Sequence, residues 1–198
     1  MGGGAGEFIT ATKPVVQEIV GTDLNKYKIE FTAKQLGLKM MHPSSLMKEY
    51  ESEYFDVITL FHVAEHFVNP VAQFELILEF LVDDGLLIVE VPNLDDWLLK
   101  VSDEYQQFWY QRAHAQFYTS NSLLEMLKRV GYLGNVEFVQ RYGLNNMFHW
   151  LRAGEPQLEE PAKVTRPYPS IQDNLYSQLL KSLNATDTML VSAMSGGG

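Results

Sequence analysis

The chain has 198 residues and a net charge of −10; 46% of its residues are hydrophobic and 12% are aromatic. That length suits one domain with an ordinary core, and the composition argues against disorder. The 15 lysines and arginines form no run, which weighs against nucleic acid as a partner, and the absence of cysteine excludes disulfides and thiol chemistry. No apolar run reaches the roughly 20 residues that span a bilayer. We therefore expect a single cytoplasmic domain over residues 1–198 that engages neither nucleic acid nor membrane.

Predicted strands and helices alternate over the first half of the chain. Apolar runs bounded by turn residues predict buried parallel strands, and apolar residues three or four positions apart predict the helices between them. Asn69 is an N-cap signal and is followed by Pro70 at the first helical position. In chain order we expect a strand at 18–22, a helix at 25–36, a strand at 38–41, a loop from His42, a strand at 55–61, a helix from 70 that stops near 83–85, and a strand at 86–91.

The pattern changes in the second half. Residues 95–110 are rich in aromatics and predict a helix, and Thr119 can cap another helix that runs to Val130. The remaining predicted elements are strands at 136–142 and 188–193 and a loop at about 152–170 that holds four of the eight prolines. Ser170 can cap a last helix at 171–183. Strand–helix alternation followed by two late strands predicts a doubly wound α/β sheet.

A glycine-rich turn opens the chain, with Gly2, Gly4 and Gly6 in a GxGxG spacing. Glycines let a backbone approach a ligand closely, and a helix that starts behind such a turn favours a negative group. About twenty residues later, Asp23 follows a short strand, where an acid can bind the paired hydroxyls of a ribose. A nicotinamide dinucleotide fingerprint would need glycine in place of Glu7, so these residues predict a different nucleoside-containing cofactor. Two alternatives stay open: Asp23 as the cap of the next helix, and the glycines as a flexible terminus.

The segment that follows the strand at 55–61 reads HVAEH and also matches the HxxEH motif of zinc proteases. That chemistry needs both histidines on one face of a continuous helix, whereas this segment connects a strand to the next helix. We therefore predict no metal site here. We expect Glu65 and His66 to hold the loop together through hydrogen bonds, with Phe61 and His62 lining a cofactor cleft at the carboxyl end of the strand.

Several blocks together resemble the class I S-adenosylmethionine-dependent methyltransferases. These blocks are residues 2–8, 19–24, 55–66 and 85–93, of which FDVITLFHVAEH at 55–66 is the most specific. His114 with residues 117–119, and then 123–131, follow the pattern of a branch that methylates small molecules, often sugars or glycan precursors. The resemblance implies a Rossmann-like, doubly wound sheet, mostly parallel with one antiparallel late strand, and S-adenosylmethionine as the cofactor.

The resemblance also implies roles for individual residues. It places the cofactor at Gly2, Gly4, Gly6, Asp23, Leu24, Phe61 and His62. Methyl transfer is an in-line substitution that the protein assists chiefly by alignment, and a base is needed only if the acceptor must lose a proton. His114 is the candidate base, with Asn93 and Tyr118 as orienting groups, although His114 could instead brace the helix that begins at Thr119. Four aromatic residues are expected to wall the acceptor pocket or to pack as a lid: Tyr105, Phe108, Trp109 and Tyr110.

Two departures from the family pattern affect these expectations. The family's glycine loop follows a strand that ends in an acid, and we expect this first strand to be missing from the chain. The loop after the third family strand has His42–Ser45 where many relatives have an acid for the adenine amine. We predict methyl transfer to a small-molecule acceptor, with a sugar or glycan precursor as the first choice, and leave a homo-oligomer open. The alternative is a truncated, non-catalytic domain that acts through binding.

Overall fold

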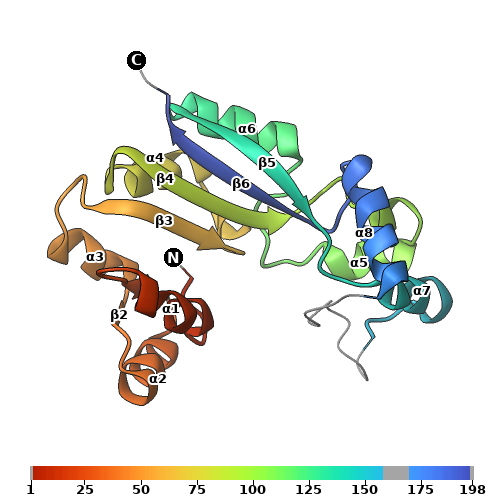
Figure 1. Ribbon diagram of the computed structural model, residues 1–198, viewed down its shortest axis with the longest axis horizontal. Coiled ribbons are helices and arrows are strands. Elements are labelled where there is room, and N and C mark those ends of the chain that lie inside the picture. The colour runs from red at the N-terminus through yellow and green to blue at the C-terminus, as the bar shows by residue number, and fades with distance from the viewer. Residues whose placement is uncertain (1, 158–169, 197–198) are drawn as a thin grey trace.

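Residues 2–157 and 170–196 are described by the computed structural model and form two sheets with helices around them (Figure 1). The main sheet has the strand order β3–β4–β6–β5, and the small sheet has the order β1–β2. Among the described strands of the main sheet, β3 and β4 are parallel, whereas β6 runs antiparallel to both of its neighbours. The predicted α/β fold, mostly parallel with an antiparallel late strand, is confirmed.

The main sheet carries the core. Its strands are β3 (Phe55–Phe61), β4 (Leu81–Pro92), β5 (Tyr132–Val139) and β6 (Thr188–Ser195). Leu87, Val89 and Val91 alternate along β4 and are fully buried, as expected for a strand face that packs against helices. Phe74 of α4 (Pro70–Leu78) and Leu123 of α6 (Ser120–Arg129) are fully buried in the same core. Each such side chain contributes about 1.5–3 kcal/mol on burial, so this core fixes where β3 and β4 end.

Residues 2–50 form a smaller unit beside β3, coloured red to orange in Figure 1. Its elements are α1 (Glu7–Thr12), η1 (Lys13–Val15), β1 (Gly21–Thr22), α2 (Lys26–Leu36), β2 (Met40–Met41) and α3 (Pro43–Glu49). The predicted strands at 18–22 and 38–41 are present as β1 and β2 but span two residues each. The predicted helix α2 is confirmed, and it ends at Gly37, whose left-handed φ of 60° suits a residue without Cβ.

A group of helices, which we call the cap, lies at the end of the main sheet where β3 and β4 terminate (Figure 1). It consists of η3 (Trp97–Lys100), α5 (Asp103–Trp109), α7 (Leu144–Ala153) and α8 (Ile171–Ser182). The cap has an apolar core of its own, built around Leu98, Tyr105, Trp109, Met147 and Trp150. It therefore forms a separate wall that faces the end of the sheet.

Three predicted caps are confirmed by side-chain hydrogen bonds to the first turns of their helices. They are Asn69, Thr119 and Ser170. Thr119 forms a capping box with Ser122, in which each side chain accepts from the other residue's backbone N–H. The predicted proline-rich loop falls mainly on residues 158–169, outside the described residues. In the described part of the chain, no helix combines the length and apolar character that crossing a membrane requires.

Other local predictions were wrong. The loop expected from His42 is helix α3, because His42 Nδ1 accepts from the Ser44 N–H and Pro43 occupies the first helical position. The residues at 83–85 lie within β4 rather than before it, because β4 pairs with β3 across an irregularity. The single helix expected at 95–110 is divided into η3 and α5, since Ser102 accepts from the backbone of residue 105 and starts a new helix.

Candidate active site

The glycine turn lies between the small sheet and the end of β3. The Gly3 N–H donates to the Thr22 carbonyl of β1 at 2.8 Å, and a Cβ on Gly2 would overlap Val63 just beyond β3. Gly2 and Gly4 have φ values of 68° and 53°, a region that L side chains rarely adopt. The turn therefore needs glycine both for its backbone conformation and for its close approach to the residues after β3.

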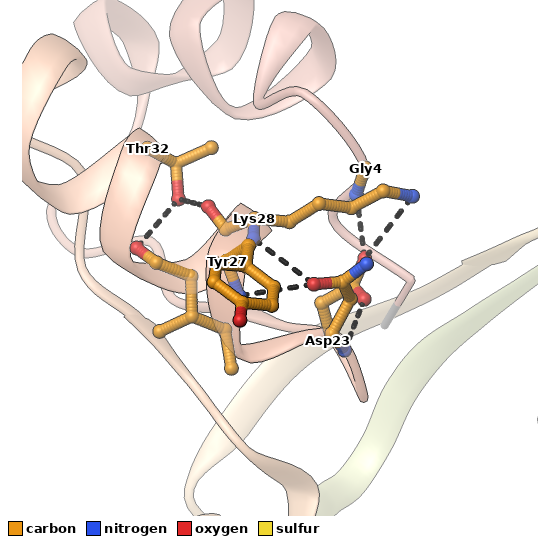
Figure 2. A network of polar contacts seen from close by, with 7 residues as sticks. Gly4, Asp23, Tyr27, Lys28 and Thr32 are labelled. Atoms are coloured by element: carbon orange, nitrogen blue, oxygen red, sulfur yellow. Dashed lines mark hydrogen bonds and ion pairs between the residues drawn. The ribbon is translucent and has the colours of Figure 1, made fainter.

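Asp23 contacts the glycine turn directly (Figure 2). Its Oδ2 accepts from the Gly4 N–H at 3.2 Å, and Lys28 Nζ lies 4.0 Å from the same oxygen. Asn25, rather than Asp23, caps α2 by accepting from the N–H groups of Tyr27 and Lys28. Asp23 is therefore not the cap of α2, and its carboxylate lies beside the glycine turn.

The other predicted cofactor residues differ in how close they come to this turn. Phe61 packs its ring against Phe8 of α1 with centroids 4.9 Å apart, so the end of β3 lies against the helix that follows the turn. Gly6 is the N-cap of the same helix, with φ 84°. Leu24 is 78% exposed, so most of its side chain faces solvent. The imidazole of His62 does not face the turn but lies beside the carboxylates of Glu65 and Glu90.

A cluster of charged side chains surrounds the carboxylate of Glu90, which is buried near the end of β4. His62 Nε2 donates to Glu90 Oε1 at 2.9 Å, and Arg141, just beyond β5, pairs with the same oxygen. His62 Nδ1 lies 3.4 Å from Glu65 Oε1. Hydrogen bonds to Glu65 and then to Glu90 raise the pKa of His62 to about 9, so the imidazole is a cation at neutral pH. Burial alone would raise the pKa of Glu90, but His62 and Arg141 outweigh it and hold that pKa below its usual range.

A pocket of about 300 Å³ opens above this cluster, between the end of the main sheet and the cap. One wall is aromatic and consists of Tyr105, Phe108, Trp109 and Trp150. The other wall is polar and includes His62, His114, Arg141 and Asp187. The predicted aromatic wall thus exists, except that Tyr110 packs on the rings of Trp109 and Phe117 instead. The site combines a flat apolar surface with several hydrogen-bonding groups.

His114 lines this pocket and is half-buried. Within residues 2–157 and 170–196, its Nδ1 is buried and has no hydrogen-bond partner. Burial lowers the pKa of His114 below its ordinary value, which favours the neutral imidazole. A neutral ring nitrogen without a partner can accept a proton or bind a cation.

Asn93 and Tyr118, predicted to orient the acceptor, lie in the core instead. Asn93 is fully buried, and its side-chain nitrogen donates to the carbonyls of Asn184 and Thr186 at 3.2 and 2.9 Å. The Tyr118 hydroxyl is buried and donates to the Ala64 carbonyl at 3.4 Å. Neither residue lines the pocket. The prediction fails for a physical reason: buried backbone carbonyls need these donors, which leaves none for an acceptor.

The HVAEH segment forms no continuous α-helix, as expected, because Ala64–His66 is a single 3₁₀ turn (η2) after β3. The Glu65 carbonyl accepts from the backbone N–H groups of residues 115–116 at 2.8 and 2.9 Å. His66 Nδ1 donates to the Ala113 carbonyl at 2.8 Å. The predicted bracing role is confirmed, and its target is the segment that carries His114.

Two buried carboxyl groups stand where the cap meets the sheet. Asp96 is 3% exposed and accepts from the Leu98 N–H and the Tyr105 hydroxyl, both at 2.9 Å. Asp187 accepts from the backbone of Arg141 and Tyr142. Burial raises the pKa of Asp96 to about 7 and that of Asp187 to about 6.

The comparisons with known proteins agree on one family. Residues 1–134 match the family described as "Methyltransferase domain". The chain belongs to this family. A solved S-adenosylmethionine-dependent methyltransferase from Archaeoglobus fulgidus is similar over 97% of this chain and 82% of its own, with 17% identity and a TM-score of 0.64. The plantazolicin methyltransferase BamL, solved with a desmethyl plantazolicin analogue and S-adenosylhomocysteine, is similar over 99% of this chain and 75% of its own, with 17% identity and a TM-score of 0.57.

One curated relative also matches, an uncharacterized protein of Methanocaldococcus jannaschii with 27% identity over 132 residues. The match covers 67% of this chain and 62% of that protein. The chain therefore spans less than two thirds of the length of this relative. The family resemblance stated from the sequence, to S-adenosylmethionine-dependent methyltransferases, is confirmed.

We expect Glu90→Gln to lower the free energy of unfolding by about 2–3 kcal/mol, measured by urea denaturation. The change leaves His62 and Arg141 without their carboxylate; the cost stays below that of a fully buried pair because both cations are partly exposed. Glu75→Gln on the exposed side of α4 is the matched control and should change stability by less than about 0.5 kcal/mol. Equal effects of the two substitutions would contradict the assigned role of Glu90.

We expect Asp96 to make the protein less stable as the pH rises. Its folded pKa of about 7 lies above the ordinary carboxyl value, so the folded state holds a proton that the unfolded chain releases earlier. Its contribution is complete below about pH 4 and is lost as the pH rises through about 7, with a slope of up to about 1.4 kcal/mol per pH unit. Asp96→Asn should flatten the dependence of the unfolding free energy on pH between about pH 4 and 7. If the unfolding free energies of the variant and of the original chain changed in parallel with pH, Asp96 would be excluded as the source of the pH dependence.

Proposed function

We propose that this protein binds S-adenosylmethionine, the cofactor of its class, at the glycine turn and transfers the methyl group to a small molecule in the adjoining pocket. One observation carries the proposal: both sites meet at the carboxyl end of β3. Phe61 and the residues after it contact the glycine turn, and the next side chain, His62, lines the pocket. Ligands of open α/β sheets bind at this end of the strands.

The contact between Asp23 and the glycine turn supports the cofactor assignment. Each carboxylate oxygen can accept two hydrogen bonds, so Asp23 can still bind ribose hydroxyls while it accepts from Gly4 and Asn25. Lys28 Nζ lies 4.0 Å from the same carboxylate. Gly2 and Gly4 leave room for a ligand to approach the backbone of the turn.

The shape of the pocket supports a small acceptor with both a flat apolar face and hydroxyl groups. A volume of about 300 Å³ is at the lower end of the range for small-molecule sites. Trp109 and Trp150 offer surfaces for the C–H face of a sugar ring, and His62 and Arg141 offer donors. We therefore keep a sugar or glycan precursor as the proposed acceptor.

His114 is the proposed base for an acceptor that must lose a proton. It lines the pocket and has a buried ring nitrogen without a partner among the described residues. Asn93 and Tyr118 have no part in this proposal, because both donate to buried carbonyls. The acceptor is aligned instead by the aromatic wall and by the side chains around Glu90.

We expect His114→Gln to lower kcat by about 100-fold or more with little change in KM, since it removes the proton acceptor but keeps the pocket's volume. The assay is transfer of a labelled methyl group from S-adenosylmethionine to a panel of monosaccharides and nucleotide sugars. His149→Gln on α7 is the matched control, because His149 does not line the pocket. No transfer to any acceptor by a folded chain that binds the cofactor would favour the non-catalytic alternative.

A further inference from the structure

We propose that Glu65, His66 and His114 form a site for a divalent cation with the coordination preferences of zinc, at the edge of the acceptor pocket. One ligand atom from each of the three side chains lies within 4.8 Å of the other two. Two imidazoles and one carboxylate are a ligand set that zinc accepts, with the fourth position left for a water or a substrate oxygen. The set differs from HxxEH, because its second histidine comes from the segment before α6.

The hydrogen bond of His66 prepares this side chain to bind a cation. His66 Nδ1 faces the Ala113 carbonyl at 2.8 Å, and a carbonyl can only accept, so Nδ1 carries the hydrogen. Nε2 of the same ring then carries the free lone pair that a cation needs. Histidines that bind metals commonly donate their other N–H to a backbone carbonyl in this way, which fixes both the tautomer and the orientation of the ring.

Glu65 and His114 each bury a polar atom that lacks a partner. Glu65 is 2% exposed; its Oε1 faces His62, whereas its Oε2 has no hydrogen-bond partner in the described parts of the chain. His114 Nδ1 is likewise buried without a hydrogen-bond partner among the described residues. An unsatisfied buried polar group costs about 1–3 kcal/mol. Two such atoms within one group of three potential ligands are the independent sign of a missing positive partner.

The three side chains need only a small adjustment to close around a cation. Ligand atoms of a tetrahedral zinc ion are about 3.3 Å apart, so no pair of the three ligand atoms needs to approach by more than about 1.5 Å. His114 lies in the segment between α5 and α6, outside any helix or strand, and its side chain can change rotamer without breaking the backbone bonds of residues 115–116 to Glu65. His66 is exposed, so an ion can reach the group from solvent.

The location of the cation site has a consequence for the reaction of the acceptor, which rests on the proposed function. His114 lines the acceptor pocket, so the open position of the cation would face a bound acceptor. A coordinated hydroxyl loses its proton more readily, and that proton would leave to water while the imidazole stays bound to the cation. In the zinc-loaded protein His114 would then be a ligand, and in the zinc-free protein it remains the proton acceptor.

The test is calorimetric titration of the whole chain, first treated with EDTA, with zinc chloride. We expect one zinc ion per chain at micromolar affinity or tighter, and at least tenfold weaker binding of magnesium chloride, which prefers oxygen ligands. His114→Gln and Glu65→Gln should each weaken zinc binding at least tenfold. His149→Gln, a histidine outside the group of three, should bind as the original chain does. Absence of zinc binding, or equal affinity in all four proteins, would overturn the proposal.

Two further readouts separate this inference from a folding defect and from the proposed function. Circular dichroism of each variant establishes that it is folded, and Glu65→Gln keeps the backbone carbonyl that holds residues 115–116. Cobalt chloride in place of zinc should give the intense visible absorption of a four-coordinate ion, lost in His114→Gln. Binding of S-adenosylhomocysteine without zinc binding would contradict this inference alone, and zinc binding without S-adenosylhomocysteine binding would contradict the proposed function alone.

Discussion

The arrangement of the site depends on one buried carboxylate, that of Glu90 at the end of β4. A buried charge is stable only when it is paired, and Glu90 obtains its partners from two other strands: His62 after β3 and Arg141 after β5. These pairs hold His62 at a φ of 52°, which an ordinary residue adopts only with strain. The ends of three strands are thereby tied together at the floor of the pocket, and the same turn of the chain brings Glu65 and His66 opposite His114.

The ion pairs of Glu90 also lie between the two binding sites of the proposed reaction, the one for the cofactor and the one for the acceptor. The glycine turn packs against the residues on one side of the end of β3, and the aromatic wall of the cap closes the pocket on the other side. Methyl transfer requires a cofactor and an acceptor in line, so the protein's main contribution is to hold two binding sites at a fixed separation. The packed core beneath β3 and β4 supplies that rigidity, because its side chains leave the strand ends little freedom to move.

Local signals in the sequence predicted most of the fold, whereas contacts between distant residues decided the rest. Asn69, Thr119 and Ser170 could be recognised as helix starts because an N-cap acts within one turn. Helix α7 had no such signal: the N–H of Leu144 is capped by Asp173, which belongs to α8. The glycine turn and Asp23 could likewise be paired by spacing, but Asn93 and Tyr118 could not be recognised as core donors before their partner carbonyls were placed. Glu90 could be noticed in the sequence as an acid inside an apolar run. The role of Arg141 as its partner follows only from the pairing of β5, β6 and β4.

The central claim is that the glycine turn and Asp23 form a cofactor site, and calorimetric titration with S-adenosylhomocysteine tests it most directly. The account predicts one binding site per chain with micromolar affinity, lost in Asp23→Ala and kept in Asp83→Ala, an exposed acid near the opposite end of β4. Circular dichroism of the three proteins would establish that each is folded. No binding by the folded original chain, or undiminished binding by Asp23→Ala, would contradict the claim.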